Sequence, residues 1–305
     1  MPLIESREDG YWTECRDRAM GSTAHVVLGD APAGLASWAL DEIERLEQCW
    51  SRFRADSELE ALHARAGEWV AVSPAMLLAL TCADDLNRST GGLFDPTIRD
   101  ALERAGYDRT FEDVGRDVCA PAPCNPAAGY QRIEIDVDDA LVRVPVGVTV
   151  DLGGIGKGLA ADLVTRGLID RGARSALVSL GGDMRARGDL PDGAWQIPVE
   201  HPLDTALVAF VRPLRNAALV SSTRRFRSWS RAGRAFHHIM DPRTGDSSRT
   251  TVVAVVAEAS EAWWAEGVAK SIVIAGVDDG TALARACGVR AWMFLDDGQM
   301  IDVVP

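Results

Sequence analysis

A single lysine lies among glycines in the middle of the chain, and this combination suits the binding of a phosphate group. The segment DLGGIGKG at 151–158 places Lys157 between two glycines. Glycine lets the backbone approach a bulky ligand because it has no Cβ, and the free N–H groups at a helix start attract anions. Apolar residues with helical spacing begin at Ile155 and stop at Gly172. We therefore expect this segment to hold an anion such as a pyrophosphate.

Two known phosphate-binding motifs do not match the glycine run. The P-loop requires a glycine where Asp151 stands and a Ser or Thr where Gly158 stands. The dinucleotide motif G-x-G-x-x-G is not matched either, because Gly154, Gly156 and Gly158 follow the spacing G-x-G-x-G. A tight turn with close helix–strand packing remains an alternative interpretation of these glycines.

A second reactive group of residues lies in the segment HIMDPRTG at 238–245. It contains His238, Asp241 and Arg243 within six positions. The Asp-Pro and Thr-Gly pairs are also typical of turns, so Asp241 has a structural interpretation as well. The preceding segment RRFRSWSRAGR at 224–234 is basic and aromatic, and a solvated loop with salt bridges explains it equally well.

Composition limits the classes of partner. The 305 residues are 47% hydrophobic and carry a formal net charge of −13, so we expect a globular protein without a nucleic-acid partner. The chain has no apolar run of membrane-spanning length and no signal-peptide pattern in its first 20 residues, which predicts a soluble, cytoplasmic protein without membrane insertion. The six cysteines are scattered and are expected to be reduced; a Cys119–Cys124 disulfide is the alternative in an oxidising compartment.

Periodicity and turn residues predict alternating strands and helices. Ser57 with Glu60, and Ser73 with Pro74, are helix-start signals. Asp95 before Pro96 indicates a turn into a helix. The predicted helices are 35–53, a short one after Ser57, 74–91, 155–172 and 260–275. The predicted strands are 25–28, 133–137, 141–146, 148–152, the segment after 172, 195–199, 207–211, 217–222 and 251–257, with an exposed loop at 115–129 and a βαβ-like tail at 282–304.

Six motifs occur in the order and at the spacing of a known family. Together they make the chain resemble the FAD:protein FMN transferase (ApbE-like flavin transferase) family over roughly residues 19–303. The resemblance implies an α+β fold of ApbE-like, T-fold-like mixed sheets with packed helices, in one domain at 19–305 after a tail or edge strand at 1–18. The motifs are MGST at 20–23, WSRF-x-x-DSEL at 50–59, TGGLFDPT at 90–97, DLGGIGKG-x-x-AD at 151–162, SLGGD at 179–183 and HIMDPRTG at 238–245.

The resemblance also implies a substrate and an activity. Family members move FMN from FAD to a threonine hydroxyl of a partner protein and release AMP, so we expect FAD and an acceptor protein bearing a Ser or Thr flavinylation site. His238 matches the family's histidine and is the candidate base because imidazole titrates near neutrality; the alternative is a histidine that orders the turn. The FAD-binding residues implied are Met20, Phe94, Asp95, Thr97, Gly154, Lys157, Asp183 and Arg243.

The chain departs from the family at one place. The family holds a divalent cation with an Asp and, four residues later, a Thr, whereas this chain has Glu266 and Lys270. Mg²⁺ accepts a carboxylate such as Glu266 but not an ammonium, which has no lone pair. Lys270 then either puts its own charge at the cation's place or forms a surface pair with Glu266. The use of Mg²⁺ is therefore left open, and a flavin carrier or sensor without transferase activity and an FAD hydrolase remain alternative functions.

Overall fold

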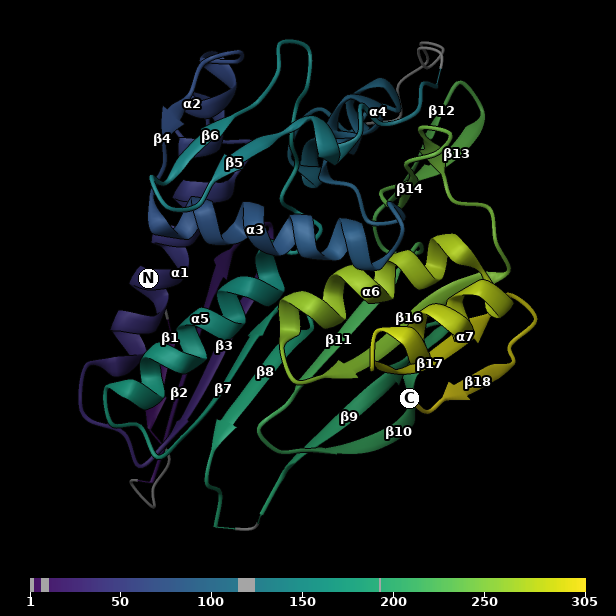
Figure 1. Cartoon of the computed structure of the whole chain (residues 1–305). Coiled ribbons are helices and arrows are strands. Elements are labelled where there is room, and N and C mark those ends of the chain that lie inside the picture. Colours follow the sequence, from purple (N-terminus) through teal and green to yellow (C-terminus); the bar gives the residue numbers. More distant parts are fainter. Residues whose placement is uncertain (1–2, 7–10, 115–123, 192) are drawn as a thin grey trace.

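A nine-stranded antiparallel sheet forms the centre of the described molecule (Figure 1). The structure is a computed structural model that describes residues 3–6, 11–114, 124–191 and 193–305. The strands follow in the spatial order β1 (Leu3–Ser6), β2 (Trp12–Ala19), β3 (Ser22–Gly29), β7 (Ser175–Leu180), β8 (Asp183–Gly188), β11 (Ala218–Thr223), β16 (Val252–Ala259), β17 (Arg290–Leu295) and β18 (Met300–Val303). The N-terminal segment thus supplies the strands at one edge of this sheet.

Helices and a hairpin cover the two faces of the sheet. Helices α1 (Leu35–Trp50), α5 (Gly156–Asp170), α6 (Ala262–Ala275) and α7 (Val277–Ala286) lie side by side on one face (Figure 1). Strand side chains alternate between faces. Val26 and Leu28 accordingly pack in the core with these helices, while Val27 packs with Ile197 and Val199 of the β9–β10 hairpin, β9 (Trp195–His201) and β10 (Asp204–Leu214). The hairpin therefore covers the opposite face.

A third layer lies over the helices. It contains α2 (Glu58–Ala64), α3 (Pro74–Ser89), α4 (Arg99–Arg104) and the small sheet β4 (Val70–Ala71), β6 (Leu141–Arg143) and β5 (Glu134–Asp136). Beside it lie the two-stranded ladders β12 (Ser228–Arg231) with β13 (Arg234–His237) and β14 (Met240–Asp241) with β15 (Asp246–Ser247). Among the described residues, no helix has both the length and the apolar character needed to cross a membrane.

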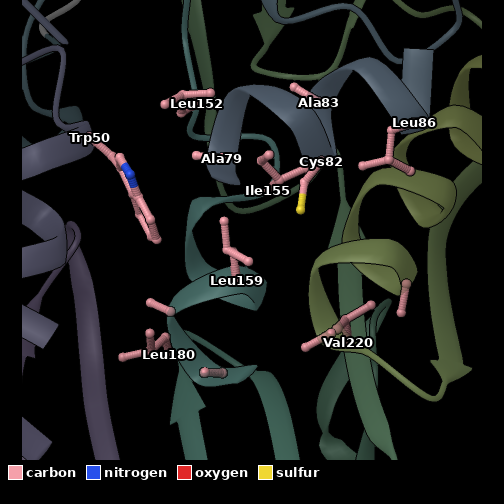
Figure 2. Close-up of a cluster of buried hydrophobic side chains, with 14 of the residues drawn as sticks. Trp50, Ala79, Cys82, Ala83, Leu86, Leu152, Ile155, Leu159, Leu180 and Val220 are labelled. Carbon is pink, nitrogen blue, oxygen red and sulfur yellow. The ribbon is translucent and has the colours of Figure 1, made fainter. Parts of the chain in front are cut away.

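The core fixes the helices that matter for the site. Trp50 of α1, Ala79 of α3 and Leu159 of α5 lie together between the layers, and Leu86 of α3 lies above α6 (Figure 2). All four side chains are almost completely buried. Burial of each of the larger side chains contributes about 1.5–3 kcal/mol to the stability of the fold. Helices α5 and α6 are therefore held firmly between the sheet and the layer above.

The predicted helix starts are confirmed. Ser57 accepts a hydrogen bond from the N–H of Glu60 at 3.1 Å, and Ser73 accepts one from the N–H of Met76 at 3.2 Å. Each bond satisfies a backbone donor that the first turn of a helix leaves free. The predicted helices correspond to α1, α2, α3, α5 and α6, although α1 ends at Trp50.

Two predicted elements are wrong. Residues 148–152 form no strand, because the N–H of Val150 donates to His63 Nε2 at 3.0 Å and that of Asp151 to the carbonyl of Pro96. The tail is not βαβ, since α7 is followed by the antiparallel pair β17 and β18. The connection between these strands turns at Gly298 (φ +88) and is too short for a crossover helix. Most of the predicted loop 115–129, including Cys119, lies outside the described residues.

Candidate active site

An aromatic cavity of about 310 Å³ opens between the helical layer and the layer above it. Its walls carry flat rings that suit a planar aromatic ligand, which would stack against them or meet their edges. The ring-bearing lining residues are Trp50, Phe53, Phe94, Tyr107 and Phe111. The Phe94 ring packs on Gly154 so closely that a Cβ there would lie 2.8 Å from Phe94 Cε2. A side chain at position 154 would therefore displace this ring.

A second cavity of about 370 Å³ lies at the end of the sheet beneath the first. The β7–β8 turn, β11 and the β9–β10 hairpin form its walls. The two cavities share five lining residues, which mark the place where they meet: Gly153, Lys157, Arg227, His238 and Lys270. Four of these side chains are basic or can become so, in a chain whose net charge is −13.

Two lysines and two carboxylates form a buried cluster at this junction. Lys157 Nζ contacts Asp183 Oδ2 and lies 3.3 Å from Glu266 Oε1. Lys270 Nζ donates to the same Glu266 oxygen at 2.8 Å. The carboxylates of Asp183 and Glu266 are fully inaccessible, whereas both lysines reach the cavities. The four charges balance, so Arg227 supplies the surplus positive charge at the junction.

The pKa values in the cluster reflect burial and mutual attraction. Burial lowers the pKa of Lys157, but the charges of Asp183 and Glu266 outweigh it and raise that pKa above its ordinary value. For Lys270, burial and repulsion by Lys157 outweigh Glu266, so its pKa is lowered. Burial would raise the pKa of Glu266, yet the two lysines hold it below the usual value. Glu266 is therefore an ionised acceptor between two cationic side chains.

Backbone contacts hold α6 against the start of α5. The N–H of Gly158, in the first turn of α5, donates to Glu266 Oε2 at 2.8 Å. A Cβ on Gly158 would lie 2.6 Å from the backbone of Ala262, so only glycine allows this approach. One of the helix N–H groups expected to bind an anion is thus already used by Glu266, and the side chain of Lys157 remains as the charged donor facing the cavities.

Asp162 positions α6 from the neighbouring helix. Its carboxylate accepts hydrogen bonds from the N–H groups of Ala262 at 2.8 Å and Trp263 at 3.0 Å, and Arg185 lies 3.1 Å away. These N–H groups have no partner within their own helix, so Asp162 acts as a cap supplied by another element. Burial raises the pKa of Asp162 to about 7.

His238 lies at the junction as a neutral imidazole. Burial and the nearby charges of Arg227 and Lys270 hold its pKa well below the ordinary value. Its Nδ1 is buried and has no hydrogen-bond partner among the described residues. An unprotonated imidazole beside two cations is suited to accept a proton from a hydroxyl or a water molecule.

The glycine turn is supported from the side. Asp151 Oδ1 accepts a hydrogen bond from the N–H of Gly153 at 2.6 Å, and its Oδ2 lies 2.8 Å from Arg52 Nε. Arg52 in turn donates to the carbonyl of Tyr107 at 2.9 Å. The turn beside Lys157 is therefore tied to the aromatic wall of the first cavity.

The structure brings most of the predicted site residues together. The first cavity is lined by Met20, Phe94, Asp95, Gly154, Lys157, His238 and Lys270, while Asp183 and Glu266 lie directly behind the lysines. Thr97 is buried behind the wall, where its hydroxyl donates to Asp95 and accepts from Gly129. Arg243 lies apart: it lines neither cavity, and its guanidinium donates to Asp241. Lys270 and Glu266 do form a pair, but it is buried in the cluster and is not a surface pair.

The residues present do not fit a divalent cation at Glu266. One carboxylate oxygen of Glu266 contacts two ammonium groups, and the other accepts a backbone N–H. Neither ammonium offers a lone pair to a metal. Within the described ranges, no group of three or more His, Cys, Asp or Glu side chains is placed to hold a metal ion. The ammonium of Lys270 lies 2.8 Å from the Glu266 oxygen that a cation would need.

Three residues that shape the site were not predicted from the sequence. Arg227 lines both cavities, and its only signal was the basic segment at 224–234. Asp162 belongs to the glycine–lysine motif, but the partner that it caps lies 100 residues later. Glu47 accepts from the N–H of Met20 at 2.8 Å, which holds Met20 at the cavity with φ +51. None of these contacts follows from local spacing.

Sequence comparison finds related proteins along nearly the whole chain. Residues 20–293 match the model of the ApbE family. A FAD:protein FMN transferase of Rhodobacter capsulatus is 30% identical over 256 residues, which is 82% of this chain and 48% of that protein, so the chain spans about half of its length. A FAD:protein FMN transferase of Treponema pallidum is 28% identical over 292 residues, covering 89% of this chain and 81% of the relative.

Solved structures agree with this result. The crystal structure of the ApbE protein of Thermotoga maritima has a TM-score of 0.86 at 26% identity and covers 95% of this chain and 96% of that one. The apo form of the Pseudomonas stutzeri flavinyl transferase ApbE has a TM-score of 0.78 at 25% identity, with 99% and 95% coverage. The α+β fold expected from the sequence is thereby confirmed. With the match over residues 20–293, these similarities show that the chain belongs to the ApbE family.

Proposed function

We propose that this protein transfers FMN from FAD to a Ser or Thr hydroxyl of an acceptor protein and releases AMP. The observation that carries the proposal is the junction itself, where an aromatic cavity ends at Lys157, Lys270 and Arg227 with the neutral His238 beside them. The names of the related transferases support the same reaction. FAD fits the cavity, because its rings match the aromatic walls and its pyrophosphate matches the basic junction.

The reaction needs few chemical groups. The acceptor hydroxyl oxygen forms a bond to the phosphorus of the FMN half, and the bond from that phosphorus to the bridging oxygen breaks, so the oxygen leaves with AMP. The hydroxyl proton passes to the neutral His238 imidazole. Lys157 and Arg227 balance the charge that develops on the phosphate oxygens. Met20, Phe94, Asp95 and Gly154 hold the ring system.

In our proposal, the cation that stabilises the phosphates is a side chain of the protein itself. Lys270 contributes the charge that a metal would bring, and Glu266 keeps this ammonium in place through the bond at 2.8 Å. A single charge stabilises a phosphate less than a divalent ion does, so we expect slow turnover with good FAD binding.

Calorimetry and product analysis test the proposal together. FAD is expected to bind more tightly than FMN, because only FAD places a pyrophosphate at the junction. Incubation with FAD and a hydroxyl acceptor is expected to release AMP and to add one FMN mass to the acceptor. FMN and AMP without an adduct would instead identify an FAD hydrolase, and tight FAD binding without AMP would identify a flavin carrier or sensor.

A further inference from the structure

The second cavity contains a strand edge without a neighbour. Strand β8 pairs with β11 only at Ala218 and Leu219, because β8 begins at Asp183 after the glycine turn. From Val220 to Thr223, β11 has no strand on that side within the described chain, although β16 pairs with it along its whole length and the N–H of Ser221 donates to Asp183 Oδ1 at 3.3 Å. The sheet therefore has a notch between the β7–β8 turn and the end of β11. An extended peptide can pair with such an edge.

An unpartnered hydroxyl marks the same place. Ser222 lines the second cavity and is only 4% exposed, and its Oγ has no hydrogen-bond partner among the described residues. A buried hydroxyl without a partner is unfavourable, and a ligand in the cavity would satisfy it. The other walls carry aliphatic and small side chains such as Met184, Val199 and Leu219. The carboxylate of Glu200 also lines the cavity from β9, and Phe226 is 61% exposed.

Two arginines near the notch lack an acidic partner. Arg225 bonds to the carbonyl of Leu203 and Arg227 to that of Gly21, and no carboxylate in the described ranges lies within ion-pair distance of them. In a chain of net charge −13, this basic edge is suited to an acidic partner.

We propose that the acceptor protein binds here as an extended, acidic segment paired with β11 at Ser221–Thr223. This inference rests on the proposed function. The two cavities meet at Lys157 and His238, so a ligand in the first cavity and a segment in the second approach the same point from different sides. Phosphoryl transfer needs the attacking and leaving oxygens in line, which favours entry from opposite sides. The aromatic first cavity takes the rings of FAD, and the notch takes the hydroxyl.

Peptide mixtures test this docking site in the full-length protein with FAD present. Each peptide of the first mixture has nine residues, with Thr at the central position. Each of the eight other positions holds Gly, Ala, Ser or Asp. The second replaces Asp by Lys, and the third replaces the central Thr by Ala and contains no Ser. The native protein is expected to add FMN to the first mixture far better than to the second and not to the third. Mass spectrometry detects the adduct, and AMP release is followed in parallel.

Two variants and a control locate the peptide. Ser221→Trp fills the notch from an exposed position and is expected to raise the peptide KM at least about tenfold with the dissociation constant of FAD unchanged. Arg225→Glu is expected to reverse the preference for Asp over Lys. Gln196→Trp, on an exposed position of β9 that lines neither cavity, is expected to behave like the native protein.

The possible results distinguish a failure of the docking site from a failure of the proposed function. An unchanged peptide KM in Ser221→Trp would overturn the docking site. AMP release without modification of any peptide would overturn it too, while leaving the FAD site in place. An absence of AMP release together with an absence of peptide modification would contradict the proposed function instead.

Discussion

Each lysine of the cluster is held by a buried carboxylate, so its removal has two effects. Lys157→Met is expected to weaken FAD binding by about 1.5–3 kcal/mol, the value of a charge-assisted contact. It also leaves Asp183 without its partner, which destabilises the fold. Adding Asp183→Asn removes that carboxylate, so the double variant is expected to regain stability in urea unfolding without regaining FAD affinity. Unchanged calorimetric affinity in the single variant would contradict a phosphate contact.

His238 is expected to act in the chemical step. His238→Asn retains the size and polarity of the side chain but removes the base, so AMP release is expected to fall about 10²–10⁴-fold while FAD affinity stays within a few-fold. Stopped assays of AMP and calorimetry with FAD measure the two quantities. Loss of FAD binding with an intact fold would show that His238 positions the ligand.

The pH profile tests the same residue without a substitution. A base acts when it is unprotonated, and burial with nearby cations lowers the pKa of His238. The acidic limb of AMP release is therefore expected below pH 6.5, with the rate rising through the lowered pKa to a plateau. A histidine of ordinary pKa would already be about three-quarters protonated at pH 6.0. A loss of this size at pH 6.0 in the native protein would argue against a buried neutral base.

Asp162 links α5 to the start of α6 and so fixes the direction of Glu266 and Lys270. Asp162→Ala removes the cap and is expected to lower the free energy of unfolding by about 1–2 kcal/mol. Asp162→Asn is the matched control, because its amide oxygen still accepts the N–H groups of Ala262 and Trp263. Urea unfolding compares the variants. Equal losses in both would show that the charge, and not the cap, carries the effect.

The elements with strong local signals were predicted correctly. Helix α3 has Ser73 as its cap and a regular apolar face, and β3 alternates between two cores. The failures occur where tertiary contacts replace local ones. Val150 donates its N–H to His63, which lies 87 residues earlier, so an apolar alternation that predicts a strand forms an irregular segment.

The parts of the site that lie close together in the sequence were predictable, and the contacts between distant residues were not. Lys157 and the glycine turn are adjacent in the sequence, and His238 lies in a recognisable motif. The contact between Lys157 and Asp183 spans 26 residues and that between Gly158 and Glu266 spans 108. Such pairings depend on the order of the strands. Arg243 shows the converse, since a residue inside a motif can face its neighbour Asp241 and not the cavity.

The nine-stranded sheet and the layers on its two faces together create the site. Helices α5 and α6 bring the two lysines to one face of the sheet, and the β9–β10 hairpin covers the other face. Because β8 pairs with only part of β11, a notch remains in the sheet and connects the two sides. No single layer contains the complete junction. We therefore propose that the assembled protein binds and cleaves FAD at a cluster whose cation is Lys270.

The rate of AMP release from saturating FAD, in EDTA and then with increasing Mg²⁺, tests this claim most directly. Because Lys270 already occupies the place beside Glu266, we predict AMP release in EDTA and less than about a twofold change with Mg²⁺, since two cations in one small volume repel each other. The variant combining Glu266→Asp with Lys270→Thr serves as the control and is expected to become dependent on Mg²⁺. AMP release by the native protein only in the presence of Mg²⁺ would contradict the account.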